Sequence, residues 1–169
     1  MYYYDSKNGI YVKGGEWIIN RECVKLSPEI ATGKVEQITK HIIWSNYVDR
    51  EQFDNQKEWL ACKNVMVNLR TGETKEHSPE FMALTQIPHN YPMHSCASYP
   101  TEIMKFLHQV MNPEDVETVL DFIAYCLWRD LPYHKWLLFN GSGRNGKGVT
   151  TNIIERLLEV STFIFFNCL

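Results

Sequence analysis

The sequence predicts two kinds of fold in succession. Residues 1–131 are expected to form an α+β accessory domain of small β-hairpins and a helical bundle. Residues 132–169 are expected to begin an α/β domain with its first strand, loop and helix. Three observations support this: short β-favouring runs between turn residues, two amphipathic helix patterns, and an apolar run that enters a glycine-rich loop.

The composition indicates a globular protein that works inside the cell. Hydrophobic residues make up 44% and charged residues 22%, which is ordinary for a soluble domain. The five cysteines are scattered without a Cys-x-x-Cys motif, and neither a secretory signal nor a membrane-length apolar run is visible. We therefore expect reduced thiols, a cytoplasmic location and no membrane contact. The net charge of -3 means that any DNA contact requires a local basic patch.

The first half of the chain predicts short elements joined by turns. A hairpin is expected over residues 11–19, because Gly14-Gly15 is a two-residue turn between β-favouring runs. Residues 27–29 (Ser-Pro-Glu) resemble a helix start, and residues 34–47 show a better helical pattern.

Strands are expected next, over residues 59–62 and 65–69, with a turn at 71–72. Residues 83–87 are a weaker strand candidate, and the prolines between 88 and 100 indicate a connecting loop. 

Three potential metal ligands, His89, His94 and Cys96, lie within that connecting loop. Their spacing fits no standard zinc pattern, and the sequence offers no obvious fourth ligand. We therefore favour surface or helix-capping histidines over a metal site.

A pair of antiparallel helices is expected after this loop. The first begins at residues 100–102 and places Phe106 and Leu107 on its apolar face. Asn112 and Pro113 then suit the cap and the first position of the second helix. The connection between the two helices is very short, which is typical of antiparallel neighbours.

The most informative stretch is the apolar run at residues 136–139, which leads into a glycine-rich loop and a helix pattern over residues 147–159. This order of strand, loop and helix is the context of a phosphate-binding P-loop. The spacing Gly141-x4-Gly146-Lys147 fits the Walker A pattern up to its last position, where Gly148 replaces the usual Ser or Thr.

The chemistry of a P-loop explains this spacing. Glycines let the backbone approach a phosphate, successive N–H groups form an anion nest, and the helix N-terminus adds partial positive charge. Lys147 would reach the β- and γ-phosphates, so it is the expected catalytic residue. The missing hydroxyl normally binds Mg²⁺, and neither Thr150 nor Thr151 is assigned in its place. The residues expected to bind ATP are Gly141, Ser142, Gly143, Arg144, Asn145, Gly146, Lys147, Gly148 and Val149.

Several stretches together resemble the phage- and plasmid-type primase–helicases, whose ATPase belongs to helicase superfamily three; poxvirus primase–helicases are similar in layout. The resemblance extends from about residue 10 to about residue 160. The Asn145-Gly146-Lys147 sequence is a mark of that family's Walker A motif. The stretches that carry the resemblance are residues 63–73, 77–80, 87–91, 106–107, 124–127 and 138–147.

This resemblance implies an accessory domain ahead of a ring-forming motor with an AAA+-like P-loop NTPase fold. Such motors are usually hexamers that move along single-stranded DNA using ATP and Mg²⁺. Lys147 would stabilise charge during γ-phosphate transfer. If the protein is viral, its location would be the host cytoplasm.

The chain departs from the family at Gly148 and in having no Walker B strand before residue 169. We therefore expect the N-terminal fragment of an ATP-dependent replicative DNA helicase, inactive in hydrolysis by itself. The alternative is a non-catalytic DNA- or replisome-binding module with a remnant P-loop, and a steep salt dependence of binding would identify DNA contact. A small-molecule kinase fits less well, because its P-loop strand would usually stand near the N-terminus.

Overall fold

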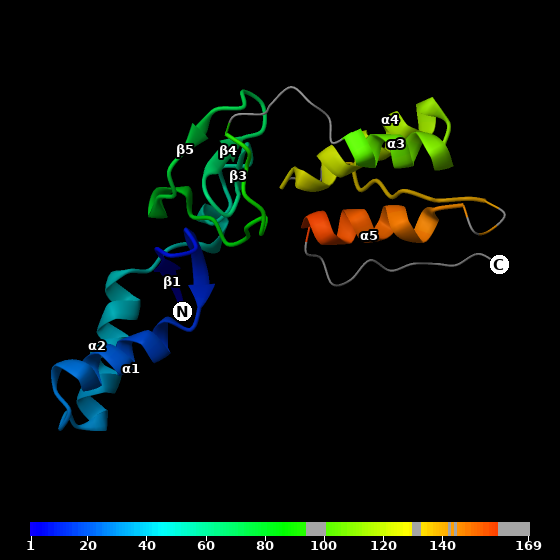
Figure 1. Ribbon diagram of the computed structural model, residues 1–169. Coiled ribbons are helices and arrows are strands. Elements are labelled where there is room, and N and C mark those ends of the chain that lie inside the picture. Colours follow the sequence, from blue (N-terminus) through cyan, green and yellow to red (C-terminus); the bar gives the residue numbers. More distant parts are fainter. Residues whose placement is uncertain (94–100, 130–132, 142, 144, 159–169) are drawn as a thin grey trace. The chain divides into compact units, whose positions relative to one another are not determined.

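The computed structural model describes residues 1–93, 101–129, 133–141, 143 and 145–158 (Figure 1). The chain divides into two compact units. The first unit contains residues 1–56 and 76–86, and the second contains residues 57–75 and 87–169. The boundary predicted after residue 131 is a different division and stays a prediction.

The first unit begins with an antiparallel hairpin of β1 (Tyr2–Asp5) and β2 (Ile10–Lys13), in which Tyr3 pairs with Val12. The carboxylate of Asp5 shapes the turn, because it accepts a hydrogen bond from the Lys7 N–H at 3.0 Å and another from the Asn8 side chain at 2.7 Å. The first hairpin of the chain therefore lies at residues 2–13.

The hairpin predicted over residues 11–19 is wrong. Strand β2 already pairs with β1, and the chain passes directly from β2 into helix α1 (Gly15–Leu26). Gly14 is the N-cap of this helix, with a left-handed φ of 110°, and its carbonyl accepts the N–H of Trp17 at 3.0 Å. A glycine pair serves a strand-to-helix junction as well as a tight turn, because both need a left-handed residue.

The predicted helix over residues 34–47 is confirmed as α2 (Thr32–Ser45), which packs against α1. The helix start predicted at residues 27–29 is wrong, because Ser27 is the C-cap of α1. The Ile30 N–H donates to the Ser27 carbonyl at 3.0 Å, so this Ser-Pro-Glu segment forms the turn between the two helices.

Residues 76–86 return to complete the first unit. The Tyr11 N–H donates to the Ala83 carbonyl at 2.7 Å, and the Asp54 N–H donates to the Met82 carbonyl at 3.0 Å. Two short 3₁₀ helices lie in this unit, η1 (Arg50–Gln52) and η2 (Pro79–Phe81). The weak strand candidate over residues 83–87 forms no strand; Ile87, which already belongs to the second unit, makes an isolated bridge to Cys62 of the same unit.

The second unit begins with a three-stranded antiparallel sheet in the order β3-β4-β5. It contains β3 (Trp59–Ala61), β4 (Met66–Asn68) and β5 (Thr74–Lys75), which confirms the two predicted strands and the turn after them. The Asn68 side chain fixes that turn, because its Oδ1 accepts the N–H groups of Arg70 and Thr71 at 2.9 and 3.0 Å.

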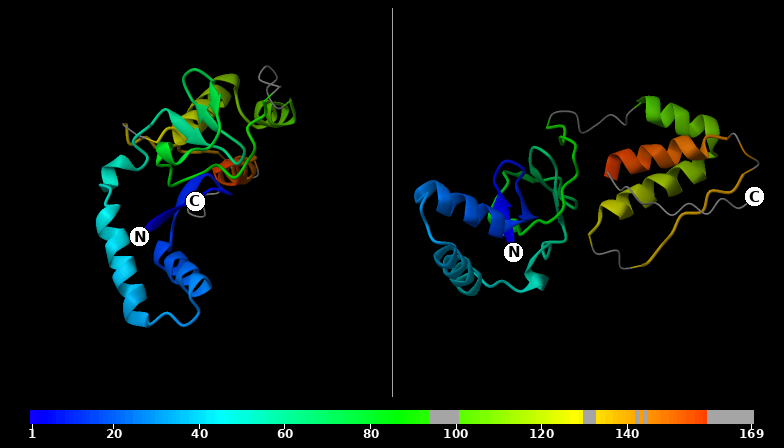
Figure 2. Two further views of the ribbon diagram at one scale, coloured as in Figure 1. Left: turned by 90° about the vertical axis from the view of Figure 1, so that its left-hand side faces the viewer. Right: turned by 90° about the horizontal axis from the view of Figure 1, so that it is seen from below.

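The three later helices are confirmed as α3 (Thr101–Val110), α4 (Pro113–Leu127) and α5 (Lys147–Leu158). Figure 2 shows all three together within the second unit. Asn112 is the N-cap of α4 and Pro113 its first residue, as the sequence predicts. The helices bury Leu107, Val116, Val119 and Ile154.

Residues 134–141 run as an irregular segment between α4 and α5 in sequence. The strand predicted over residues 136–139 has no strand partner among the described residues, so it stays a prediction. No described helix has both the length and the apolar character needed to cross a membrane.

Candidate functional site

The glycine-rich loop leads directly into the N-terminus of α5. Gly143 and Gly146 have φ angles of 93° and 81°, a backbone region in which only glycine is free of strain. These two glycines are therefore required by the path of the backbone itself. Ser142 and Arg144, which are predicted to bind nucleotide, lie outside the described residues.

Side chains from the end of the loop fold back onto its beginning. The Lys147 ammonium donates a hydrogen bond to the Gly141 carbonyl, with 2.9 Å between Nζ and O. The Asn145 amide lies so close to Gly141 that a Cβ at this position would collide with its Nδ2 atom. The Asn145 Oδ1 atom is buried and accepts no hydrogen bond from the described residues. The structure thus brings together three predicted site residues: Gly141, Asn145 and Lys147.

Gly146 fixes the position of the loop against helix α3. A Cβ on Gly146 would lie 2.8 Å from Val110 Cγ1 and 3.2 Å from Phe106 Cζ. The backbone at the end of the loop therefore packs directly on α3. This contact places the corner between α3 and α4 beside the candidate phosphate site.

The hydroxyl groups near the start of α5 donate to the helix itself. Thr150 Oγ1 donates to the Gly146 carbonyl at 3.2 Å, and Thr151 Oγ1 lies 3.0 Å from the Gly148 carbonyl. Val149 is half exposed. Such back-bonding is common for Ser and Thr in helices, and it gives neither threonine a metal-binding role. The described residues include no cluster of three or more His, Cys, Asp or Glu that could hold a metal ion.

His89 contacts the end of a helix, which is one of the two roles that the sequence analysis favours for it. Its Nε2 atom lies 2.8 Å from the carbonyl oxygen of Arg156, in the last turn of α5. Because a carbonyl only accepts, the ring nitrogen is the donor, and it satisfies one of the carbonyls left open at a helix end. His94 and Cys96, the other two candidate metal ligands, lie outside the described residues.

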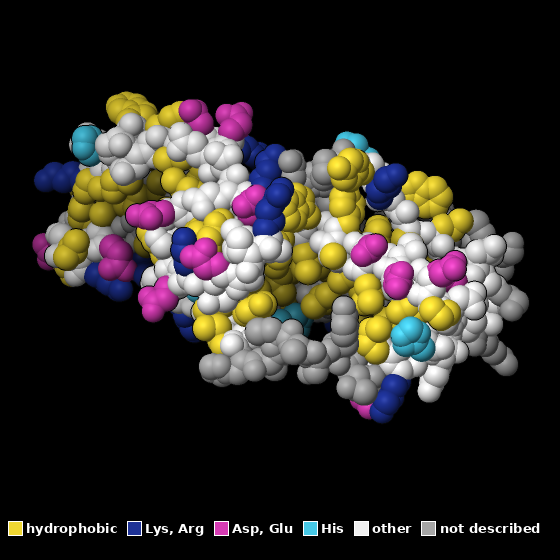
Figure 3. Space-filling view, turned by 90° about the horizontal axis from the view of Figure 1, so that it is seen from above, with side chains coloured by type: hydrophobic (Ala, Val, Ile, Leu, Met, Phe, Trp, Pro, Cys, Tyr) yellow, Lys and Arg dark blue, Asp and Glu magenta, His cyan; other side chains and the backbone are white. Residues whose placement is uncertain are grey.

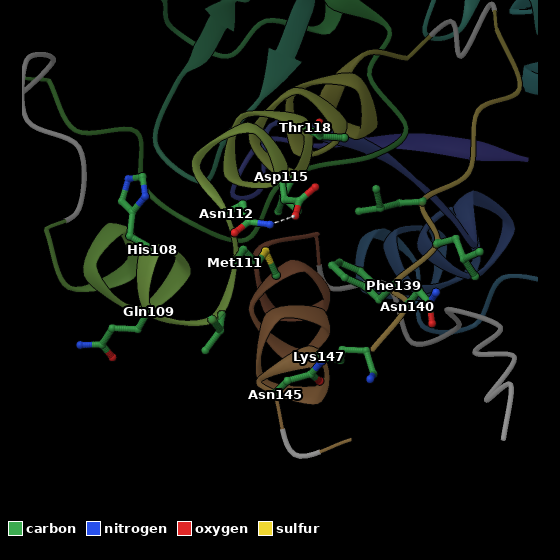
Figure 4. A pocket seen from close by; sticks show the side chains of 14 residues that line it. His108, Gln109, Met111, Asn112, Asp115, Thr118, Phe139, Asn140, Asn145 and Lys147 are labelled. Atoms are coloured by element: carbon green, nitrogen blue, oxygen red, sulfur yellow. Dashed lines mark hydrogen bonds between the residues drawn. The ribbon is translucent and has the colours of Figure 1, made fainter. Parts of the chain in front are cut away.

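A cavity of about 720 Å³ opens beside the loop (Figure 4). The corner between α3 and α4 forms one wall, and residues 137–140 with Asn145 and Lys147 form the other. The walls contain both apolar and polar side chains. The lining residues are His108, Gln109, Val110, Met111, Asn112, Asp115, Thr118, Val119, Leu137, Leu138, Phe139, Asn140, Asn145 and Lys147.

The wall opposite the loop carries a carboxylate. Asp115 lies in the first turn of α4, where the helix dipole favours a negative charge. The Asn112 side chain approaches Asp115, with 3.5 Å between Nδ2 and Oδ2. Sequence reasoning identified these residues only as helix-start signals. In the sequence, these residues stand next to an apolar helix face, which by itself does not indicate a binding site. Their role becomes visible only in the structure, where the glycine-rich loop packs against this helix corner.

Two further findings come from comparison with known proteins. A family model described as D5 N terminal like matches residues 1–112. No curated protein matches the chain. The matched region includes the whole first unit, the three-stranded sheet and α3, and it stops at the corner before α4. Since this match covers 112 of the 169 residues, the chain belongs to the D5 N-terminal-like family, the N-terminal domain of D5-like primase–helicase proteins.

Proposed function

We propose that this chain is the front part of a phage, plasmid or viral replicative DNA helicase, and that its loop at residues 141–148 binds a nucleoside triphosphate. The observation that carries the proposal is the Gly141–Lys147 loop at the N-terminus of the 12-residue helix α5. The family membership supports the same assignment independently, because the matched residues 1–112 do not include the loop.

The loop has the physical properties that a phosphate group requires. The first N–H groups of a helix lack partners within the helix, and its dipole favours an anion at this end. Gly143 and Gly146 have left-handed φ angles, and an anion-binding nest of successive N–H groups uses residues in this conformation. Lys147 adds a full positive charge at the same place, so the residues present fit a triphosphate.

The hydrogen bond between Lys147 and Gly141 is the contact that a nucleotide would replace. Both contacts are charge-assisted because the ammonium is ionised, but a carbonyl oxygen carries only a partial negative charge, whereas a phosphate carries a full one and adds ion–ion attraction. The bond is exposed to solvent, so Lys147 can exchange it for a phosphate oxygen. Before that exchange, the Gly141 carbonyl holds the ammonium close to the site.

ATP would supply the transferable γ-phosphate, and Mg²⁺ would neutralise its charge. Gly148 offers no hydroxyl for the metal, and Thr150 and Thr151 donate to backbone carbonyls. The metal ligand and the residues that complete hydrolysis are therefore assigned to the rest of the motor. In the full-length protein we propose a superfamily-three ring, a homo-hexamer on single-stranded DNA, driven by this site.

A titration with a fluorescent ATP analogue tests the proposal on the 169-residue chain. Lys147→Ala should weaken binding about tenfold or more, because it removes a charge-assisted contact to phosphate. The matched control is Lys135→Ala, which removes an exposed lysine that does not line the cavity. Equal binding by the wild type and the Lys147 variant, or no binding by either, would contradict the proposal.

A further inference from the structure

We propose that the cavity beside the loop holds the nucleoside half of the nucleotide, and that Asp115 accepts hydrogen bonds from the ribose hydroxyls. This inference rests on the proposed function of the loop and adds a second binding group to it. It makes the α3–α4 corner, which lies ahead of the loop in sequence, part of the nucleotide site.

The first step is that one cavity contains both groups. Lys147 and Asp115 line the same space of about 720 Å³, from helices α5 and α4. Figure 4 shows them at separate places on its wall, with Lys147 by the loop and Asp115 by the helix corner. A volume of this size lies within the ordinary range for small-molecule sites. A ligand bound at Lys147 therefore has open space toward Asp115 within the same cavity.

The second step is the charge of the two ends. A carboxylate repels phosphate, so the triphosphate belongs at Lys147 and the N-terminus of α5. Asp115 instead requires a partner that donates hydrogen bonds and carries no negative charge. The two hydroxyls of a ribose meet this requirement, and an ionised carboxylate offers two oxygens that can accept both.

The third step is that the carboxylate of Asp115 is exposed and open to a ligand. The Asn112 amide approaches its Oδ2 atom at 3.5 Å, which is longer than an ordinary hydrogen bond, and both side chains are exposed. The Oδ1 atom of Asp115 stays available, because the Asn112 contact uses Oδ2.

The fourth step is the apolar part of the wall. Met111, Val119, Leu137 and Phe139 line the cavity together with the polar groups. Met111 and Val119 come from the helix corner, and Phe139 precedes the loop. A nucleobase has two apolar faces, and burial of such faces against hydrophobic side chains is favourable. The cavity thus offers a different surface to each part of a nucleotide: cationic, carboxylate and apolar.

The experiment compares three ligands on the full 169-residue chain: ATP, 2′,3′-dideoxy-ATP and inorganic tripolyphosphate. Asp115→Asn should weaken ATP binding about tenfold, because it removes charged hydrogen bonds to ribose. It should leave the affinity for dideoxy-ATP and tripolyphosphate unchanged. Glu114→Gln is the matched control, since Glu114 lies in the same first turn of α4 but does not line the cavity.

Each outcome of this comparison decides a separate point. If Asp115→Asn weakens all three ligands equally, or weakens none, the inference is overturned while binding by the loop still stands. If the wild type binds none of the three, the proposed function fails as well. Circular dichroism shows whether Asp115→Asn keeps its fold. A second variant, Asp115→Glu, keeps the negative charge, so it should retain more ATP affinity than Asp115→Asn.

Discussion

Helices of the two units differ in how much of their surface they bury. In the first unit, α1 buries only Gly15, and α2 has no buried residue. In the second unit, α4 buries Val116 and Val119, and α5 buries Thr150 and Ile154. Of these four helices, α2, α4 and α5 were predicted from the helical spacing of their apolar residues. Helical periodicity therefore predicts that a helix forms, and says much less about what covers it.

The first unit shows the consequence at its surface. Trp17 is 62% exposed, Leu26 86% and Trp44 77%. In the space-filling view, hydrophobic side chains lie uncovered over the part that carries α1 and α2 (Figure 3). The Trp17 ring does have one neighbour, the Arg21 guanidinium, 4.9 Å from its centroid. Helices α1 and α2 pack against each other but leave large apolar side chains exposed, whereas the helices of the second unit bury apolar side chains.

The largest expected difference comes from removing one leucine in each unit. Leu107 in α3 is only 2% exposed, so Leu107→Ala should lower the free energy of unfolding of the second unit by about 2–5 kcal/mol. Leu26→Ala is the same chemical change at a site that is 86% exposed, and it should cost less than about 0.5 kcal/mol. Urea unfolding followed by circular dichroism measures both. Similar losses of unfolding free energy for Leu107→Ala and Leu26→Ala would contradict the difference in burial between the two units.

A smaller effect is expected at Arg70, which joins two parts of the second unit. Its Nε atom lies 2.7 Å from Glu58 Oε1, and its guanidinium lies 5.3 Å from the centroid of the Trp128 ring. Both partners of the ion pair are about half exposed, so solvent weakens the pair. Arg70→Met should cost about 1 kcal/mol or less in thermal unfolding.

Arg70→Lys serves as the control for that substitution. Lysine keeps the charge but loses the planar group that stacks on Trp128. If stacking contributes more than the ion pair, the lysine variant should be almost as unstable as the methionine variant. A loss well above 2 kcal/mol for either variant would show that the contact is stronger than its exposure implies.

The smallest expected effect concerns the thiols, and it depends on pH. Burial raises the pKa of the Cys62 thiol and that of Cys126. Cys62 is buried, whereas Cys126 and Cys23 in α1 are only partly buried. A raised folded-state pKa stabilises the fold fully below the ordinary thiol pKa of about 8.5, and this contribution is lost as pH rises further.

Unfolding at pH 7.5 and pH 10 measures this contribution. The wild type should lose slightly more stability across that interval than Cys62→Ala does. Alkylation at pH 8 gives an independent test, because the buried Cys62 should react more slowly than Cys23. Equal alkylation rates at the two sites would contradict the difference in burial.

The sequence predicted α2, α3, α4 and α5 and strands β3 and β4, because caps and periodicity are local signals. It failed at residues 11–19, because Gly14-Gly15 suits a hairpin turn and a helix cap alike, and the choice depended on β1 pairing with β2. Contacts such as Arg70 with Trp128 join residues 58 positions apart and leave no local pattern.

In the candidate site, too, the local sequence pattern was predictable and the long-range contacts were not. Gly141, Gly146 and Lys147 form a contiguous motif, so their spacing could be read directly. Asp115 and Asn112 lie about thirty residues earlier and resemble an ordinary helix start. They join the site only because Gly146 packs on Val110 and brings the helix corner beside the loop. The cavity is a product of that contact.

The interleaved order of the two units has a consequence for synthesis on the ribosome. Strand β2 and Asp54 form hydrogen bonds to residues 82–83, which emerge only after the whole β3–β5 sheet segment has been translated. The first unit therefore cannot close when its first 56 residues leave the exit tunnel. Its exposed side chains Trp17, Leu26 and Trp44 then stand in an incomplete nascent chain, where a chaperone that binds hydrophobic segments would meet them first.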